Sequence, residues 1–483
     1  MNDRKYAIVI FILFFQIYVL TSGGHHYYDE RIAFENARSI VENGRLDLPE
    51  ELARKLPWGV VQAADGKYYS RYSIVWILTF VPFTTLAKLI SSLTNLPLVW
   101  HQYDTYPLVW ILYNPIFVAG IASVLFLFSR NLGFNPRLSL VLVLIFGLST
   151  LAWPYSKTGL NIPLCTLSFL TSMYLIRLNR EKTRLKLYLA SGTLGSLSAL
   201  VRFDFILFLP FLIAFALMVD RKSTFENRAK SLLGLAFPVL VFIITVGYYN
   251  YLRFGSFLET GYSYGYGLRD YGILSIHTTP LHVGICGLLL STGVGLFIFV
   301  PVSIISIPSF LQLYKKDSSL AMISISIFLF TLFYYGSLGF WHGWPEWGPR
   351  YLFINIPLLL LALGAAFESW KSIVFKVTVT LLALAGSFVN IVAILYDWTL
   401  TFSNIYKEKV WSVVGQTTVP DWLLFDPPYS PIARQLPEVL GGKFDLFLLS
   451  HCGLIPMTIL TITTFITGFI LARDPWRIRW HIR

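Results

Sequence analysis

Charged residues are scarce in this 483-residue sequence: they make up 13% of it, whereas 55% of the residues are hydrophobic and 17% are aromatic. The mean hydropathy is +0.62. This much apolar material exceeds what one water-soluble core needs, so the composition excludes a soluble enzyme. The apolar residues fall into blocks of about 17 to 25, the length at which a helix crosses roughly 30 Å of hydrocarbon. The sequence therefore predicts an all-α polytopic membrane protein.

Cysteine and the common enzyme motifs are also scarce. The three cysteines, Cys165, Cys286 and Cys452, lie in or beside apolar segments without disulfide or metal-ligand spacing, so we interpret them as small hydrophobes. No P-loop, GxSxG, HExxH or dinucleotide fingerprint occurs in a suitable context, which counts against ATP-driven transport and common hydrolase chemistry. No internal repeat or inverted hydropathy symmetry is evident. That absence weakens a secondary-transporter interpretation but leaves it open.

The net charge of +12 comes from basic clusters that lie between apolar blocks. The positive-inside rule explains such clusters better than a nucleic-acid partner does. We therefore expect these basic residues to be cytoplasmic: Arg177, Arg180, Lys182, Arg184, Lys186, Arg221, Lys222, Arg228, Lys230, Lys315, Lys316, and Arg473, Arg477, Arg479 and Arg483 of the tail.

This placement predicts about twelve crossings from about thirteen apolar segments, with both termini cytoplasmic. Segment 6–20 is expected as a retained first span, because Ser22-Gly23-Gly24 is a poor signal-peptide cleavage site. Segments 73–92 and 107–129 lie between an external loop and a cytoplasmic turn, so one of them is expected to be re-entrant or interfacial. The remaining segments pair as hairpins with external loops: 138–153 with 162–176, 187–203 with 205–220, 231–250 with 284–312, 318–338 with 351–368, and 372–395 with 447–471.

Three parts are expected along the chain. Residues 1–395 form a transmembrane domain that includes the external loop 21–72, residues 396–446 form an ordered external loop rich in proline and tryptophan, and residues 447–483 hold the last span and the basic tail. Within loop 21–72, the residues Ala33, Ala37, Ile40 and Val41 fall on one face of a helix that starts near Glu30. Such an amphipathic helix is suited to lying in the membrane interface.

The first external loop opens with the carboxylate pair Asp29-Glu30. A carboxylate at the water edge of a membrane cavity can act as a general base between a lipid-borne donor and an aqueous acceptor. Alternatively, Asp29 is only the N-cap of the following helix, with Glu30 favoured by the helix dipole. The same stretch could hold a divalent metal ion through His26 and Asp29. However, the adjacent residues His25 and His26 do not easily share one metal centre, and the sequence contains no second ligand cluster. We therefore expect no required cofactor.

Cations near span ends are candidates for binding a phosphate. Lys67 and Arg71 lie in the run DGKYYSRY at 65–72, where fixed donors would meet a lipid phosphate near the headgroup plane. Lys157, Arg202 and Arg350 lie in external turns, and Arg350 is the best single candidate because its guanidinium can grip phosphate bidentately. The alternatives are snorkelling to headgroups and, for Arg202, a local ion pair with Asp204.

Two further external stretches are rich in aromatic residues, 250–262 and Trp341-His342-Gly343-Trp344-Pro345-Glu346-Trp347. Sugar-binding surfaces favour rings that present an apolar face and a hydroxyl, although an interfacial aromatic belt explains many of these rings equally well. The candidate substrate-binding residues are Tyr69, Glu259, Tyr262, His342 and Glu346.

The order of these features resembles the GT-C superfamily of polytopic glycosyltransferases, particularly its protein O-mannosyltransferase-like and lipid A aminoarabinose transferase-like members. The resemblance runs over roughly residues 1–370 and is carried by Asp29-Glu30, DGKYYSRY at 65–72, WPYSK at 153–157, RFGS…ETGY at 253–262 and WGPRY at 347–351. It implies transfer of a monosaccharide from a polyprenyl-phosphate-linked donor, with Asp29 as the base and Glu30 beside it. Asn161 stands where many relatives carry an acidic residue, which argues against a second carboxylate there.

The expected reaction is one inverting displacement at the anomeric carbon, on the external face of the cell membrane. The phosphate leaving group needs little protonation, so one carboxylate suffices where glycosidases use two, and positioned cations stabilise its charge. The expected partners are the lipid-linked sugar, membrane lipids and a glycan, lipid or protein acceptor, with no nucleic acid. Two alternatives remain: a transporter or flippase of lipid-linked intermediates, and a non-catalytic membrane scaffold.

Overall fold

A computed structural model describes residues 2–23, 29–56, 59–63, 65–94, 107–180, 183–221, 223–261, 276–343, 345–408, 420–449 and 454–473. The chain packs into two compact units. Unit 1 comprises residues 1–25, 114–158 and 279–483, and unit 2 comprises residues 26–113 and 159–278. Helix α5 (Pro107–Asn131) contributes its first residues to unit 2 and the residues from Asn114 onward to unit 1.

Over the ranges described, the structure is all-α apart from one short hairpin, as expected. In unit 1 the helices are α1 (Asp3–Leu20), α6 (Pro136–Ser149), α7 (Ala152–Ser156), α14 (Leu281–Leu290), α15 (Leu296–Phe299), α16 (Ser303–Ser306), α17 (Phe310–Lys316), α18 (Ser318–Gly336), η3 (Arg350–Leu352), α19 (Asn355–Ser369), α20 (Ile373–Leu395), α21 (Trp398–Tyr406), α22 (Asp421–Phe425), η5 (Pro427–Tyr429), α23 (Pro431–Leu440) and α24 (Leu454–Arg473). In unit 2 the elements are α2 (Asp29–Asn43), α3 (Glu50–Lys55), β1 (Val60–Gln62), β2 (Tyr68–Ser70), α4 (Ile74–Thr94), α8 (Ile162–Arg177), α9 (Leu185–Val201), η1 (Phe203–Phe208), α10 (Leu209–Val219) and α11 (Phe225–Phe254).

Among the described residues, six helices are long and apolar enough to cross a membrane: α4, α5, α11, α18, α20 and α24. Shorter apolar helices accompany them, namely α6, α8, α9, η1 with α10, α14 and α19. The first turn of α1 carries Asp3, Arg4 and Lys5, which shortens its uncharged stretch. These helices are those of a multi-pass integral membrane protein. Both α4 and α5 have the length of a full span, so length does not single out the re-entrant segment expected between 73 and 129, and the count of about twelve crossings stays a prediction.

The apolar segment 284–312 differs from expectation, because it is broken into α14, α15, α16 and α17. Backbone groups at the first break find partners in the last loop of the chain: the Gly293 amide and the Thr292 hydroxyl both donate to the carbonyl of Leu424. The hydroxyl of Ser430 donates in turn to the carbonyl of Thr292. Irregular backbone among apolar segments is tolerated when protein satisfies its polar groups. No property of 284–312 alone indicates this, because the acceptor lies more than a hundred residues away.

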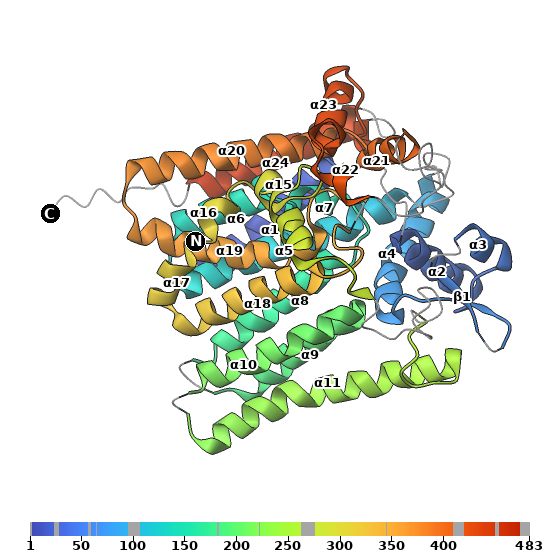
Figure 1. Ribbon diagram of the computed structural model, residues 1–483, viewed down its shortest axis with the longest axis horizontal. Helices are drawn as coiled ribbons and strands as arrows, with labels where there is room; N and C mark the ends of the chain where they lie inside the picture. The colour runs from blue at the N-terminus through green and yellow to red at the C-terminus, as the bar shows by residue number, and fades with distance from the viewer. Residues whose placement is uncertain are drawn as a thin grey trace. The chain divides into compact units, whose positions relative to one another are not determined.

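Helix packing in unit 2 depends on small residues. A side chain at Gly192 of α9 would lie 2.6 Å from the Leu235 carbonyl of α11, and one at Gly234 would lie 2.8 Å from Cβ of Tyr188. Small residues at such contacts let helix backbones approach closely, as is common in membranes. Figure 1 shows α9 and α11 as neighbouring green helices, in agreement with their contacts.

Helix α2 begins at Asp29, close to the predicted start. The helix packs against α4 and is buried along much of its length, and its expected position in the membrane interface stays a prediction. Ala33 and Ala37 are buried as the apolar spacing predicts, whereas Ile40 and Val41 are only half-buried. Phe34 lies against Trp110 of α5, with ring centroids 5.2 Å apart. Protein therefore covers much of the apolar face of α2.

Candidate functional site

In unit 2 the carboxylate of Asp29 is held by a tyrosine from the end of the hairpin. The Tyr72 hydroxyl donates a 2.5 Å hydrogen bond to Oδ1 of Asp29. Asp29 is half-exposed, and its Oδ2 accepts no hydrogen bond from the described residues. Asp29 is the first residue of α2, so its side chain does not serve as the N-cap considered above. An oriented carboxylate with one free oxygen is the arrangement that a general base requires.

Tyr72 is itself fixed in place. It is buried, its ring packs edge-on against Trp76 at 5.4 Å, and its backbone amide donates to the Ser70 hydroxyl. The Arg71 guanidinium lies 5.4 Å from the Tyr72 ring centroid and donates to its hydroxyl at 3.4 Å. The predicted residues Asp29 and Arg71 thus come together through Tyr72, which the sequence contained in the DGKYYSRY run but did not single out.

Glu30 points into unit 2, away from solvent. Its side chain is 3% exposed. A Cβ at Gly159 would lie 2.8 Å from Cβ of Glu30 and 2.4 Å from the ring of Trp110. The absence of a side chain at Gly159 therefore makes room for both residues. This placement favours a positioning role for Glu30 over contact with an acceptor in water.

The hairpin carries Lys67 and Tyr69. Lys67 is exposed in the turn after Gly66, whose φ of 79° suits glycine. The Tyr69 hydroxyl donates to Asp65 Oδ2 at 2.9 Å. Burial and this hydrogen bond raise the pKa of Tyr69 to about 12, so its hydroxyl remains a donor at any physiological pH.

The other predicted residues of unit 2 make local contacts or lie outside the described residues. Arg202 and Asp204 form the local ion pair that the sequence allowed, with Nε 2.7 Å from Oδ1 and Nη2 2.8 Å from Oδ2. Glu259 accepts a hydrogen bond from the Gly261 amide at 2.7 Å. Tyr262 and His26 lie outside the described residues.

In unit 1 Arg350 lies in a compact group of polar and aromatic side chains. Its Nη1 is 3.9 Å from Oε1 of the buried Glu346, and its Nη2 donates to the Tyr351 hydroxyl at 3.4 Å. The guanidinium lies 5.2 Å from the Tyr351 ring centroid, and that ring stacks on Tyr335 at 4.4 Å. Gly343, with a φ of 61°, leaves the space that Arg350 occupies, because a Cβ there would lie 2.6 Å from Nε of Arg350.

His342 and Tyr155 belong to the same group. His342 is buried, and burial together with the Arg350 charge lowers its pKa to about 3, so the imidazole is neutral at physiological pH. The Tyr155 hydroxyl is buried near Glu346 and Arg350 and has no hydrogen-bond partner among the described residues. Burial raises the pKa of Tyr155 well above its usual value. The group thus offers a cation, a neutral imidazole and a phenol donor.

The side chain of Lys157 forms buried contacts within unit 1. Its ammonium is fully buried and donates to the carbonyls of Ile394 and Asp445 at 2.8 and 2.9 Å. The third interaction is an ion pair with Oδ2 of Asp445 at 3.0 Å. Gly23 packs so closely against this side chain that a Cβ there would lie 2.2 Å from Cε of Lys157. This geometry favours a structural role for Lys157 over phosphate binding.

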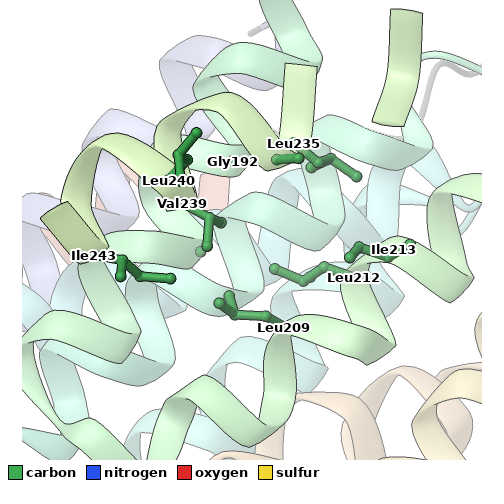
Figure 2. Close-up of a pocket in the computed structure, with 10 residues that line it drawn as sticks. Gly192, Leu209, Leu212, Ile213, Leu235, Val239, Leu240 and Ile243 are labelled. Carbon is green, nitrogen blue, oxygen red and sulfur yellow. The ribbon is translucent and has the colours of Figure 1, made fainter. Parts of the chain in front are cut away.

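Two further features of the described residues are the spacing of possible metal ligands and an apolar cavity. Among the described residues, no three His, Cys, Asp or Glu side chains gather as a metal-binding group. An apolar cavity of about 220 Å³ lies among α9, α10 and α11 of unit 2 (Figure 2). It is lined by Gly192, Gly195, Leu209, Leu212, Ile213, Leu235, Ala236, Val239, Leu240 and Ile243. With no polar side chain, this lining offers nothing to a sugar or a phosphate.

No family model matches the sequence, and no curated protein is significantly similar to it. Functional inference therefore depends on the residues described above. One of them, Asp445, carried no signal in the sequence beyond its ordinary residue type, and Tyr155 was present in the WPYSK motif but was not singled out.

Proposed function

We propose that the protein is a membrane glycosyltransferase that moves a monosaccharide from a polyprenyl-phosphate-linked donor to an acceptor hydroxyl on the external face. The observation that supports this most is the hydrogen bond from Tyr72 to Asp29. It orients one carboxylate oxygen and leaves the other available to a proton-bearing substrate. The GT-C-like order of motifs supports the same class of reaction.

In the proposed reaction Asp29 Oδ2 takes the acceptor proton while the acceptor oxygen attacks the anomeric carbon from the face opposite the phosphate. The bond between the anomeric carbon and the phosphate oxygen breaks, and the phosphate leaves with the electron pair, so the anomeric configuration inverts. Arg71, in the same unit as Asp29, is the proposed electrostatic partner of the departing phosphate. Phosphate binding by Arg350 stays a separate prediction for unit 1. Lys67 is an exposed second candidate, and the acceptor is a lipid, glycan or protein hydroxyl.

The placement of charges favours this enzyme over a transporter of lipid-linked intermediates. A transport path through the membrane requires ionisable groups deep within spans. In the described candidate spans the charged residues lie toward the helix ends, as Arg130 does in α5, Lys376 in α20 and Arg473 in α24. Ion-paired or snorkelling side chains at such positions need no transport role.

The test is transfer of radiolabel from a polyprenyl-phosphate sugar to acceptors in a membrane extract by the purified full-length chain. Asp29→Asn is expected to lower the rate by about 10²- to 10⁴-fold, because an amide cannot take the proton. Glu50→Gln, which neutralises a carboxylate in the exposed α3, is the matched control and should transfer normally. Undiminished transfer by a folded Asp29→Asn variant would remove Asp29 as the base, and no product from the unsubstituted chain with any lipid-linked sugar would refute the enzyme.

A further inference from the structure

The apolar cavity among α9, α10 and α11 of unit 2 has a buried inner wall and an exposed mouth. The inner wall comes from all three helices and consists of Gly192, Gly195, Leu209, Leu212 and Leu235. The mouth residues Ile213 of α10 and Leu240 and Ile243 of α11 are 37%, 57% and 41% exposed. Figure 2 shows these α10 and α11 side chains around the space. The cavity therefore opens outward between α10 and α11.

The surface around the mouth is that of a membrane-spanning helix. Helix α11 is 30 residues long and apolar enough to cross a membrane. Beside the cavity it exposes large apolar side chains that take no part in the lining: Leu233, Phe237, Val241 and Ile244. Such a surface faces hydrocarbon in a bilayer. The mouth therefore opens toward lipid acyl chains and not toward water.

One end of this helix group is tied together by a buried carboxylate. Asp220 directly follows α10, and its Oδ2 accepts a 2.9 Å hydrogen bond from the Tyr188 hydroxyl of α9. The Ser231 hydroxyl of α11 donates to the same oxygen. The start of α9, the end of α10 and the start of α11 therefore lie together at one end of the group.

The inner wall of the cavity lies at a similar depth from this end on all three helices. Gly192 lies seven residues after α9 begins, Leu212 lies seven residues before α10 ends, and Leu235 lies ten residues after α11 begins. With a rise of about 1.5 Å per residue, the wall is roughly 10 to 15 Å from the helix ends. Each leaflet contributes roughly 15 Å of hydrocarbon. The cavity is thus at the depth of the acyl chains of the leaflet on this side.

The same end of the helix group carries an excess of positive charge. Its exposed cations are Arg184, Lys186, Arg221, Arg228 and Lys230. Of the acidic residues described at this end, Glu226 pairs with Lys230 and Asp220 is buried. Basic residues at the membrane surface attract anionic headgroups. A lipid with a chain in the cavity would place its headgroup near these cations, so charge complementarity favours an anionic lipid.

The size and the lining of the cavity define which part of a lipid it accepts. Its volume is about 220 Å³. Apolar cavities of roughly 150 Å³ already stay dry and bind small apolar molecules. A helix, about 10 Å across, is too wide for this space. A flexible hydrocarbon chain fits, and it restores the packing contacts that an empty cavity lacks.

We propose that this cavity holds one acyl chain of an anionic phospholipid, whose headgroup lies at the basic end of α9, α10 and α11. The bound chain completes the packing of these helices. The site is separate from the proposed reaction, because the hairpin contacts the opposite end of α11, where Arg253 Nη1 donates to the Ser70 carbonyl at 2.7 Å. The inference therefore goes beyond the proposed function and does not depend on it.

The test measures lipid binding by native mass spectrometry of the delipidated full-length chain in detergent micelles. The probes are phosphatidylglycerol, phosphatidylcholine with the same acyl chains, and decaprenyl phosphate. Val239→Phe places a ring in the cavity and is expected to weaken phosphatidylglycerol binding about tenfold or more. Val241→Phe is the matched control, because it makes the same change on an exposed part of α11 outside the lining, and it should bind like the unsubstituted chain.

Thermal unfolding in detergent gives a second readout of the same site. Phosphatidylglycerol should raise the unfolding temperature of the unsubstituted chain and of Val241→Phe, because a ligand stabilises the folded state that binds it. It should not raise that of Val239→Phe, whose cavity is already filled.

The headgroup is tested by comparing the two phospholipids. The unsubstituted chain should bind phosphatidylglycerol more tightly than phosphatidylcholine. Arg221→Gln should reduce this preference by about fivefold, since it removes one exposed cation of the basic end. Arg54→Gln, which neutralises an exposed arginine of α3, is the control and should leave the preference unchanged.

Equal phosphatidylglycerol binding by the two phenylalanine variants would overturn the proposal. Equal affinity of the unsubstituted chain for the two phospholipids would overturn the placement of the headgroup. Displacement of phosphatidylglycerol by equimolar decaprenyl phosphate would assign the cavity to an isoprenoid chain and overturn the phospholipid. If Val239→Phe does not fold, Ala236→Phe decides, because Ala236 lies at the exposed mouth and its substitution blocks the entrance only, and unchanged binding there overturns the proposal as well.

Discussion

The ammonium of Lys157 and the carboxylate of Asp445 lie 3.0 Å apart although 288 residues separate them in the sequence. Both side chains are buried, and the same ammonium also binds the carbonyl at the end of α20. The last loop of the chain is thereby tied to the turn after α7 within unit 1. Hydropathy alone places Lys157 at a water-facing turn, whereas in the structure its buried ammonium holds two remote segments of unit 1 together.

Lys157→Met should destabilise the protein by about 3–5 kcal/mol, because it leaves the Asp445 carboxylate buried without a cation. The double variant Lys157→Met with Asp445→Leu should recover much of this loss, since both buried charges are then removed. Thermal unfolding in detergent measures both effects. Lys443→Met, which breaks an exposed pair with Glu438, is the control and should unfold close to the unsubstituted chain. A stable double variant that has lost polyprenyl phosphate binding would instead give Lys157 a direct role in binding.

Tyr72→Phe should reduce sugar transfer by about 10- to 100-fold, because it removes the donor that orients Asp29. The ring and its packing on Trp76 remain, so the fold should change little. Steady-state transfer kinetics with the labelled donor are the measurement. Tyr68→Phe changes a neighbouring half-buried tyrosine that does not touch Asp29, and it should keep full activity. Equal rates for the two phenylalanine variants would show that the hydrogen bond to Asp29 is irrelevant to turnover.

Gly343→Ala should weaken donor binding and destabilise unit 1, because its methyl group would collide with Arg350. Gly44→Ala is the matched control: Gly44 has nearly the same backbone conformation, with a φ of 64°, but nothing lies within 4 Å of a Cβ built there. Each alanine should cost about 1–2 kcal/mol for the left-handed backbone alone. The difference between the two variants in unfolding and in decaprenyl phosphate affinity measures the displacement of Arg350. Identical behaviour would mean that Arg350 moves aside without consequence.

His342 predicts a dependence of stability on pH. Its pKa is about 3 in the fold, against about 6.5 in the unfolded chain, so the unfolded chain binds more protons between these values. The stability that neutral His342 provides is therefore complete above pH 6.5 and is lost as the pH falls toward 3, by at most about 1.4 kcal/mol per pH unit. Unfolding free energies between pH 4.5 and 7.5 should show a steeper slope for the unsubstituted chain than for His342→Gln. Parallel curves for the two proteins would contradict the low pKa.

Local features of the fold were predictable because they depend on neighbouring residues. The start of α2 follows from apolar spacing after Asp29, and the pair Arg202 with Asp204 follows from their two-residue separation. The break in segment 284–312 was not predictable. The backbone groups at the break form hydrogen bonds with Leu424 and Ser430, which lie in a loop far away in the sequence. The burial of α2 against α4 was hidden for the same reason.

The residues of the candidate site also fall into those that the sequence identified and those that only the structure identified. Asp29, Arg71 and Arg350 were identified from residue type and position, because a carboxylate or guanidinium beside an apolar segment requires a reason to be there. Tyr72 and Arg253 were present in the noted motifs, but their importance arises from contacts with Asp29 and Ser70 that join distant parts of unit 2. Residue type alone cannot show which hydroxyl meets which carboxylate.

By itself the sequence determined that the protein is a multi-pass membrane protein and where most of its long helices lie, because hydropathy is a sum over consecutive residues. Only the tertiary structure decided which charged side chains are occupied by the fold, as Lys157 is, and which have an acceptor to spare, as Asp29 does. The physical reason is that a hydrogen bond or ion pair is made by whichever group packing brings within about 3 Å, and in this chain that group often lies far away in the sequence.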